Sequence, residues 1–186
     1  MNDIQQAIAV LREGGLFLYP TDTVWGIGCD ATNEAAVAAV YALKQRSDTK
    51  SLIVLVDSMN MVEQYVQQVP PMAYDLTSIS NTPLTIVYPN AINIAANVLA
   101  EDGSVAIRVT QHDFCRELIQ NFKRPIISTS ANISDEPTPL SFAGISEKIK
   151  KGVSFIVDKA LEKGATRKPS SIIKLGIDGT IAVIRK

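Results

Sequence analysis

The sequence predicts an α/β domain built on a twisted, mixed sheet. Strand patterns alternate with helical patterns through the first two thirds of the chain and cluster at its end, an order typical of this class. Residues 52–56 form a continuous apolar run, as expected of a strand covered on both faces. The chain has 186 residues, of which 46% are hydrophobic and 20% charged. Residues 1–186 are therefore predicted to form a single domain with a sizeable core.

The predicted strands are short apolar or alternating segments bounded by glycine, proline or polar turns. They lie at residues 16–19, 52–56, 84–88, 104–109, 125–128, 153–157, 170–175 and 180–184. Residues 90–100 fit either a helix or a loop. In α/β folds, ligands bind where strand ends open into loops, so the polar clusters at 20–23 and 128–132 become candidate site residues. Two polar segments, 134–140 and 162–169, are predicted to close over the ligand.

Helices are predicted where apolar residues recur at helical spacing after a good N-cap residue. Asn2 or Asp3 caps the first helix, which the Gly14–Gly15 pair ends. Thr32 or Asn33 caps the second. Further helices are predicted at residues 59–66, after the 70–71 proline pair, and at 112–122 and 141–151.

Gly26 and Gly28 are predicted to form a turn that requires glycine, because the backbone there would adopt conformations that a Cβ forbids. They do not form a dinucleotide-binding fingerprint, since the third glycine and the helix-opening position are missing. There is no Walker A sequence either. If ATP binds here, it binds differently from ATP in a P-loop enzyme.

Composition excludes several classes of protein. The net charge is −1 and the pI about 5.8, so binding to nucleic acid would need a local basic patch. A single histidine, His112, disfavours a histidine triad or a histidine-rich metal site. Cys29 and Cys115 lack metal-ligand spacing and are predicted to be reduced thiols, and Cys29 is predicted to be a small buried residue. No apolar run reaches the length of a membrane span and no leader pattern is present, so a cytoplasmic protein is expected.

Three cations, Lys44, Arg46 and Lys50, stand just past the end of the second predicted helix. One interpretation is that they are solvated charges at a helix C-terminus. The other is a phosphate clamp, in which Arg46 makes two parallel hydrogen bonds and the lysines add charge. The sequence alone leaves both open.

Polar residues after later strands also have two interpretations. The Ser128–Asn132 segment can cap a helix or form a turn, or it can bind a phosphate or ribose. Arg108 and Arg185 can be solvent-facing charges, and Ser170 an ordinary residue at a strand entry.

Taken together, these motifs resemble those of the YrdC-like family. YPTDTVWGIGCDA, KQRSDTKSLIVLV, SVAIRV, STSANISDEPTP, and PSSIIKL followed by IAVIR occur in the family's order, from Leu16 to Arg185. The resemblance implies a twisted α/β sheet around a concave, positively charged groove. It also implies a short, single-domain threonylcarbamoyl-AMP synthase, a nucleotidyltransferase that joins L-threonine, bicarbonate and ATP with Mg²⁺ carried by the nucleotide. A separate threonylcarbamoyl transferase complex would use the product to modify tRNA, with which this protein could itself be in contact.

The resemblance also assigns roles to individual residues. Lys44 and Arg46 would be catalytic. The implied ATP-binding residues are Arg46, Lys50, Ser104, Ser130, Asn132, Thr138 and Arg185. The implied threonine-binding residues are Thr23, Arg108, Ser128 and Ser170.

The sequence departs from the family pattern at five positions. Leu55 replaces a histidine that some members place near threonine, and Asp135 replaces the usual glycine. The others are Ser51, Thr110 and Ser171. Two further hypotheses compete with the synthase: a non-catalytic RNA-binding module that uses the same groove, and a carbamoyl-adenylate enzyme that acts on carbamoyl phosphate.

Overall fold

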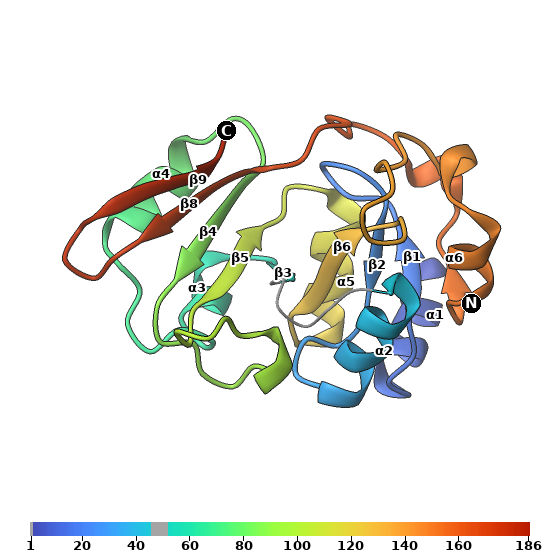
Figure 1. Cartoon of the computed structure of the whole chain (residues 1–186), viewed down its shortest axis with the longest axis horizontal. Coiled ribbons are helices and arrows are strands. Elements are labelled where there is room, and N and C mark those ends of the chain that lie inside the picture. Colours follow the sequence, from blue (N-terminus) through green and yellow to red (C-terminus); the bar gives the residue numbers. More distant parts are fainter. Residues whose placement is uncertain (1, 46–51) are drawn as a thin grey trace.

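A mixed β-sheet forms the centre of the molecule in the computed structural model, which describes residues 2–45 and 52–186. The sheet has nine strands in the described residues, in the order β7-β1-β2-β6-β3-β5-β4-β8-β9 (Figure 1). Their bounds are β1 Phe17–Tyr19, β2 Gly26–Gly28, β3 Ile53–Val56, β4 Leu84–Tyr88, β5 Val105–Val109, β6 Ile126–Ser130, β7 Phe155–Ile156, β8 Ser171–Leu175 and β9 Ile181–Arg185. The predicted mixed α/β sheet is therefore confirmed.

Strand pairing explains how distant segments meet. β1 pairs parallel to β7, β3 to β5 and β4 to β8, whereas the other neighbours are antiparallel. β6 lies between β2 and β3 and so joins the two halves of the sheet. As a result, the loop after β1, the end of β6 and the start of β8 all border the middle of the sheet (Figure 1).

Helices cover the sheet, and their starts follow the predicted caps. Asn2 accepts a hydrogen bond from Gln5 N, and Asn33 accepts one from Ala36 N. α1 and α5 pack against each other. The helices are α1 Asp3–Arg12, α2 Glu34–Lys44, α3 Met59–Val62, α4 Met72–Ile79, α5 Asp113–Phe122 and α6 Glu147–Lys151, with 3₁₀ turns at Ala96–Val98, Phe142–Gly144 and Lys159–Leu161.

Two predicted helices are shorter in the structure. The helix expected at 59–66 ends at Val62 in the structure. Val66 instead forms a β-bridge with Ala91. The helix expected at 141–151 is split: a 3₁₀ turn is followed by α6, which starts afresh with Ser146 as its N-cap. The spacing of apolar residues does not reveal such a break, because two short helical segments in succession show the same spacing as one longer helix.

The predicted turn at Gly26–Gly28 was wrong, because these residues form β2. Neither glycine has a positive φ. Space, not backbone conformation, explains Gly28: an added Cβ would lie 2.6 Å from a ring carbon of Tyr19 and 2.7 Å from one of Phe17. The stacked rings of Phe17 and Tyr19 therefore pack directly on the β2 backbone.

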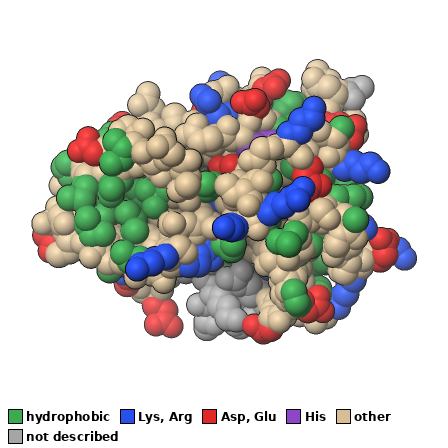
Figure 2. Space-filling view, turned by 90° about the horizontal axis from the view of Figure 1, so that it is seen from above, with side chains coloured by type: hydrophobic (Ala, Val, Ile, Leu, Met, Phe, Trp, Pro, Cys, Tyr) green, Lys and Arg blue, Asp and Glu red, His purple; other side chains and the backbone are tan. Residues whose placement is uncertain are grey.

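The last third of the chain spans the molecule. β7 forms one edge of the sheet and β9 the other, so residues 157–170 cross from one side to the other (Figure 1). Seen from above, apolar side chains gather at the end formed by α4, β8 and β9 (Figure 2), where Val183 on the edge strand is 60% exposed. In the part of the chain that the structure describes, no helix has the length and apolar character needed to cross a bilayer.

Candidate functional site

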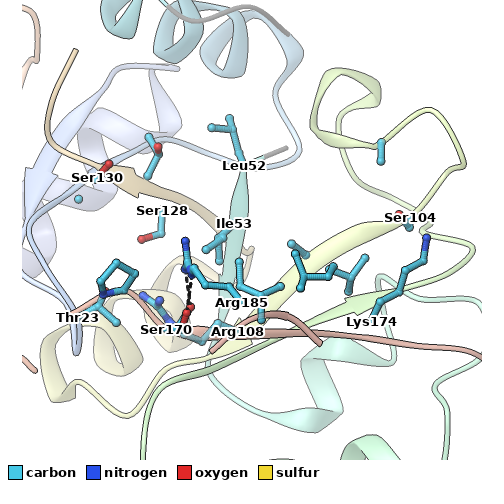
Figure 3. A pocket seen from close by; sticks show the side chains of 18 of the residues that line it. Thr23, Leu52, Ile53, Ser104, Arg108, Ser128, Ser130, Ser170, Lys174 and Arg185 are labelled. Carbon is cyan, nitrogen blue, oxygen red and sulfur yellow. Dashed lines mark hydrogen bonds between the residues drawn. The ribbon is translucent and has the colours of Figure 1, made fainter. Parts of the chain in front are cut away.

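A cavity of about 1060 Å³ opens over the middle of the sheet, and Figure 3 shows the side chains around it. Segments from both halves of the sheet contribute to its wall. Eight of the residues predicted from the sequence line it: Thr23, Ser104, Arg108, Ser128, Ser130, Thr138, Ser170 and Arg185. The fold thus gathers around one cavity residues that are up to 162 positions apart in the chain (23 to 185).

The loop after β1 holds Thr23 through its neighbours. The hydroxyl groups of Thr21 and Thr23 are 2.9 Å apart, and Thr21 Oγ1 also donates to the carbonyl of Val24 and accepts from Thr23 N. The loop is fixed from outside as well, because Thr166 N donates to the carbonyl oxygen of residue 22 at 3.0 Å and Arg167 N to that of Thr23 at 2.9 Å. The predicted closing segment 162–169 is therefore attached to this loop through the backbone.

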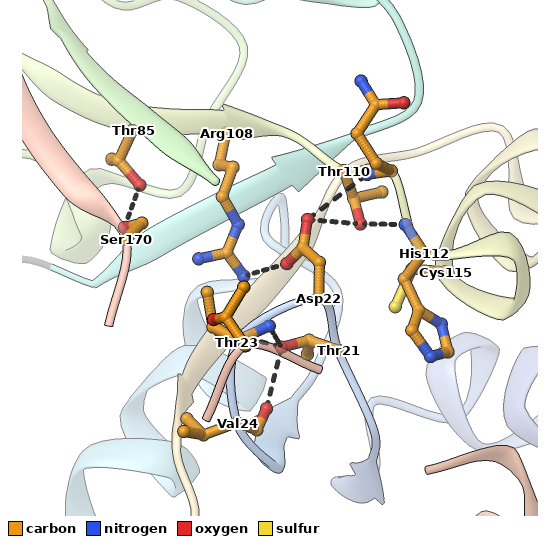
Figure 4. Close-up of polar contacts among 12 residues, drawn as sticks. Thr21, Asp22, Thr23, Val24, Thr85, Arg108, Thr110, His112, Cys115 and Ser170 are labelled. Atoms are coloured by element: carbon orange, nitrogen blue, oxygen red, sulfur yellow. Dashed lines mark hydrogen bonds and ion pairs between the residues drawn. The ribbon is translucent and has the colours of Figure 1, made fainter. Parts of the chain in front are cut away.

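Arg108 is the buried cation of the cavity. It lies on β5, and its side chain is only 3% exposed. Its Nη2 lies 3.1 Å from Oδ1 of Asp22 (Figure 4). Asp22 lies in the polar cluster at 20–23, but no pattern in the sequence predicts its contact with Arg108.

Ser170 holds the Arg185 side chain, which extends from β9. Arg185 donates from Nε to the carbonyl oxygen of Ser170 at 2.9 Å, and the Ser170 hydroxyl lies 2.8 Å from that of Thr85. Burial, and then the positive charge of Arg108, lower the pKa of Arg185 from its usual value. Two arginines therefore face the same cavity and repel each other, which favours binding of an anion between them.

The far end of the cavity has a second polar cluster. Lys174 pairs with Asp102, and Ser104 donates to the other oxygen of Asp102 from both its hydroxyl and its backbone N–H. The Lys174 ammonium, followed by the Ser104 donors, holds the pKa of Asp102 well below its usual range. Lys174 was not predicted as a site residue. Because its charge is matched by Asp102, it adds little net charge to the cavity.

The wall between these polar groups is apolar. Its aliphatic side chains come from the start of β3, from β4, β8 and β9, and from the residue after the 3₁₀ turn that precedes β5; they are Leu52, Ile53, Val87, Leu99, Ile172 and Ile184. Trp25 lines the cavity as well. A planar, weakly polar group can pack there while charged groups bind at the polar ends.

Lys44 and Asn132 do not line the cavity. Lys44 is the last residue of α2 and is 2% exposed; its Nζ donates to the carbonyl oxygens of Ser130 and Asn132, at 2.5 and 2.6 Å. Asn132 donates from Nδ2 to the carbonyl oxygens of Ile133 and Glu136. Both side chains thus hold the chain at the end of β6, where Ser130 lies, and in the segment that leads from there to Thr138. Arg46, Lys50 and Ser51 lie outside the described residues.

The departures from the family pattern are accommodated locally. Leu55 is buried opposite Arg108 in the β3–β5 pairing and does not line the cavity. Asp135 has φ of 67°, in the left-handed region that glycine adopts without strain and that aspartate tolerates better than most residues. Thr110 donates from its backbone to Val56 and from its hydroxyl to Asp22.

Thiol and metal chemistry have little support among the described residues. Cys29 and Cys115 are buried, and burial raises the pKa of both thiols above the usual value. No group of three or more histidine, cysteine, aspartate or glutamate side chains there is placed to hold a metal ion.

Comparison with known proteins identifies the family. The Sua5/YciO/YrdC family model, described as "Telomere recombination", matches residues 9–186. A threonylcarbamoyl-AMP synthase of Pseudoalteromonas translucida is 36% identical over 172 residues, which cover 91% of each chain. A similar synthase of Chromohalobacter salexigens is 35% identical over 170 residues, covering 91% of this chain and 90% of that protein.

A solved structure has a similar fold. P. abyssi Sua5 in complex with L-threonine has a TM-score of 0.83 and 30% identity, covering 92% of this chain. The match covers 50% of that protein, so this chain spans about half its length. Because the family model matches nearly the whole chain and a relative is 36% identical over 91% of it, the chain belongs to the Sua5/YciO/YrdC family.

Proposed function

We propose that this protein is an L-threonylcarbamoyl-AMP synthase. L-Threonine, bicarbonate and ATP would give threonylcarbamoyl-AMP, diphosphate and water. The relatives named for this activity, which cover nine tenths of the chain, support an enzyme of the transferase class; that it is a nucleotidyltransferase is part of the proposal.

The observation that carries the proposal is the buried Arg108. Nε and Nη2 of its guanidinium have no hydrogen-bond partner among the described residues, although both atoms are buried. Buried polar groups are normally hydrogen-bonded, and a guanidinium binds a carboxylate through two parallel hydrogen bonds. The hydroxyls of Thr23, Ser128 and Ser170 line the same cavity. A small hydroxylated amino acid, whose carboxylate meets Arg108, matches this set of groups.

ATP would occupy the rest of the cavity. The apolar wall provides a surface for the adenine ring, and Arg185 would bind phosphate, with Ser104, Ser130 and Thr138 as further polar contacts. Arg46 and Lys50 are proposed to add charge at the triphosphate, and the positive charge of the groove remains part of the proposal. Mg²⁺ bound to the nucleotide would neutralise phosphate charge, since Mg²⁺ prefers phosphate oxygens and water to a protein cage.

The reaction is proposed to proceed in two steps. The amine of threonine attacks CO₂ derived from bicarbonate, and the carbamate forms with loss of a proton. A carbamate oxygen then attacks the α-phosphorus, and the bond to the β-phosphate oxygen breaks, so diphosphate leaves with the electron pair. The carboxylate, the carbamate and the triphosphate that must meet in the second step are all anionic. Cations and fixed donors that hold them together are therefore expected to provide most of the catalysis.

Diphosphate release by the purified protein tests the proposal. The assay contains ATP and Mg²⁺ in CO₂-depleted buffer, with threonine and bicarbonate each omitted in turn. Release that needs both substrates is expected. No release by protein that still binds ATP would refute the synthase activity, and salt-sensitive tRNA binding by such a protein would favour the RNA-binding module. The cytoplasmic location, the contact with tRNA and the downstream transferase complex remain proposals.

A further inference from the structure

Arg108 and Asp22 form a close ion pair that lacks well-directed hydrogen bonds. Nη2 and Oδ1 are 3.1 Å apart, and the two side chains are 3% and 10% exposed. Nevertheless, neither Nε nor Nη2 of Arg108, nor Oδ1 of Asp22, makes a hydrogen bond to any described residue. Asp22 therefore contacts Nη2 at ion-pair distance but leaves Nε without a partner and makes no well-directed hydrogen bond with Nη2. A carboxylate and a guanidinium can form two parallel hydrogen bonds, and Asp22 and Arg108 form neither of them.

Asp22 is itself held firmly from the side away from the cavity. Its Oδ2 accepts from Gln111 N at 3.2 Å and from Thr110 Oγ1 at 3.4 Å (Figure 4). Thr110 Oγ1 in turn accepts from the backbone N–H of His112. The backbone carbonyl of Asp22 accepts from Thr166 N. The segment after β5 thus fixes the carboxylate, and the segment that crosses the sheet fixes the backbone of Asp22.

The charges around Arg108 require such a partner. Arg185 faces the same cavity, and its pKa is lowered first by burial and then by the positive charge of Arg108. A buried guanidinium without a counter-ion would move towards water or destabilise the fold. Asp22 offsets this cost, yet it does not line the cavity that Arg108 lines.

We propose that Asp22 is a positioning residue, which holds the Arg108 guanidinium so that its unused N–H groups face the carboxylate of threonine. This inference rests on the proposed synthase function. It assigns to Asp22 no contact with the substrate: Asp22 acts through Arg108.

The Asp22→Asn variant tests the inference. The amide that replaces the carboxylate presents its NH₂ group either to the Arg108 guanidinium or to the N–H of Gln111, so one donor faces another in both orientations. The KM for threonine is expected to rise roughly 10- to 100-fold, the range for loss of a charged, orienting contact. The KM for ATP is expected to stay within about 2-fold, because the contact is on the threonine side.

Two further measurements separate positioning from general damage. In an Arg108→Lys background, Asp22→Asn should raise the threonine KM by less than about 3-fold, because coupled residues are not additive. The variant should also discriminate less between threonine and threonine amide, which lacks the carboxylate. Full additivity, or unchanged discrimination, would overturn the inference.

Asp30→Asn is the matched control. Asp30 is also buried and pairs with an arginine, Arg124, at 3.0 Å, but that arginine is 57% exposed and outside the cavity. The control is expected to lower the unfolding midpoint without changing the threonine KM. An equal rise in threonine KM in both variants would show that loss of stability is the cause.

Failure of the inference is distinguishable from failure of the function. If the unaltered protein shows no threonine-dependent diphosphate release, the proposed function is wrong. If it shows release and Asp22→Asn leaves the threonine KM unchanged, only the role of Asp22 is wrong. If Asp22→Asn does not fold, Thr110→Val removes one donor to Oδ2 and should raise the same KM by a smaller factor; an unchanged KM in that variant would refute positioning.

Discussion

Lys44→Met tests whether this lysine acts on phosphate or on the fold. Its Nζ is bound to the carbonyl oxygens of Ser130 and Asn132. Methionine has similar length but cannot donate, so both carbonyls would lose a charged donor. Hydrogen bonds to charged groups contribute about 1.5–3 kcal/mol each, and part of that loss is offset because a buried ammonium no longer has to be desolvated. The net loss in the free energy of unfolding is expected to be about 3 kcal/mol.

Thermal unfolding measures this loss directly. For a chain of this size, 1 kcal/mol corresponds to a change of about 2–4 °C in Tm, so Tm should fall by about 6–12 °C. Lys148→Met is the control, since Lys148 also lies in the last turn of a helix but is exposed; its Tm should change by less than about 2 °C. A Lys44→Met protein with unaltered Tm and diphosphate release lowered 100-fold or more would refute the structural role and restore the catalytic one.

Three other expectations follow from the packing and the cavity. Gly28→Ala should lower the free energy of unfolding by about 2 kcal/mol in urea titration, because its Cβ would overlap the Phe17 and Tyr19 rings; Gly26→Ala, whose nearest contact would be 3.4 Å, should cost clearly less, and equal losses would contradict the packing argument. The two cysteine thiols, buried and with raised pKa, should react with a thiol reagent at pH 8 only after unfolding; rapid labelling of the folded protein would show the burial to be wrong. Serine should be a poor but detectable substrate and valine a much worse one, since a site that pairs a hydroxyl strongly rejects an analogue without it; equal turnover of valine and threonine would refute the hydroxyl-binding pocket.

Most of the fold could be predicted because local patterns and tertiary structure agree. Every predicted strand has a counterpart, and the Asn33 cap starts α2 as expected. β2 was missed because a strand of three residues that contains two glycines carries no apolar alternation. Its glycines satisfy a packing requirement set by Phe17 and Tyr19, and a sequence does not show which rings will lie above it.

The sequence predicted which residues belong to the site better than it predicted the contacts between them. Polar residues at strand ends indicated Thr23, Ser128 and Ser170, which line one cavity. The pattern could not show that Lys44 turns inward to backbone carbonyls, because an exposed and a buried lysine at a helix end look alike in sequence. Nor could it show that Asp22 pairs with Arg108, which is 86 positions further along the chain (108 minus 22).

The path of the chain across the sheet also determines when the cavity can be completed. β8 pairs with β4 and carries β9, so Ser170 and Arg185 reach the cavity only after the chain has returned from β7 at the opposite edge. During synthesis, the segments that precede β7 emerge first and can fold around an open cavity. Ser170, just before β8, and Arg185, on β9, reach the cavity last. Their contacts are distant in sequence and therefore slow to form. A chain interrupted before β8 would keep much of its core yet lack one wall of the binding site.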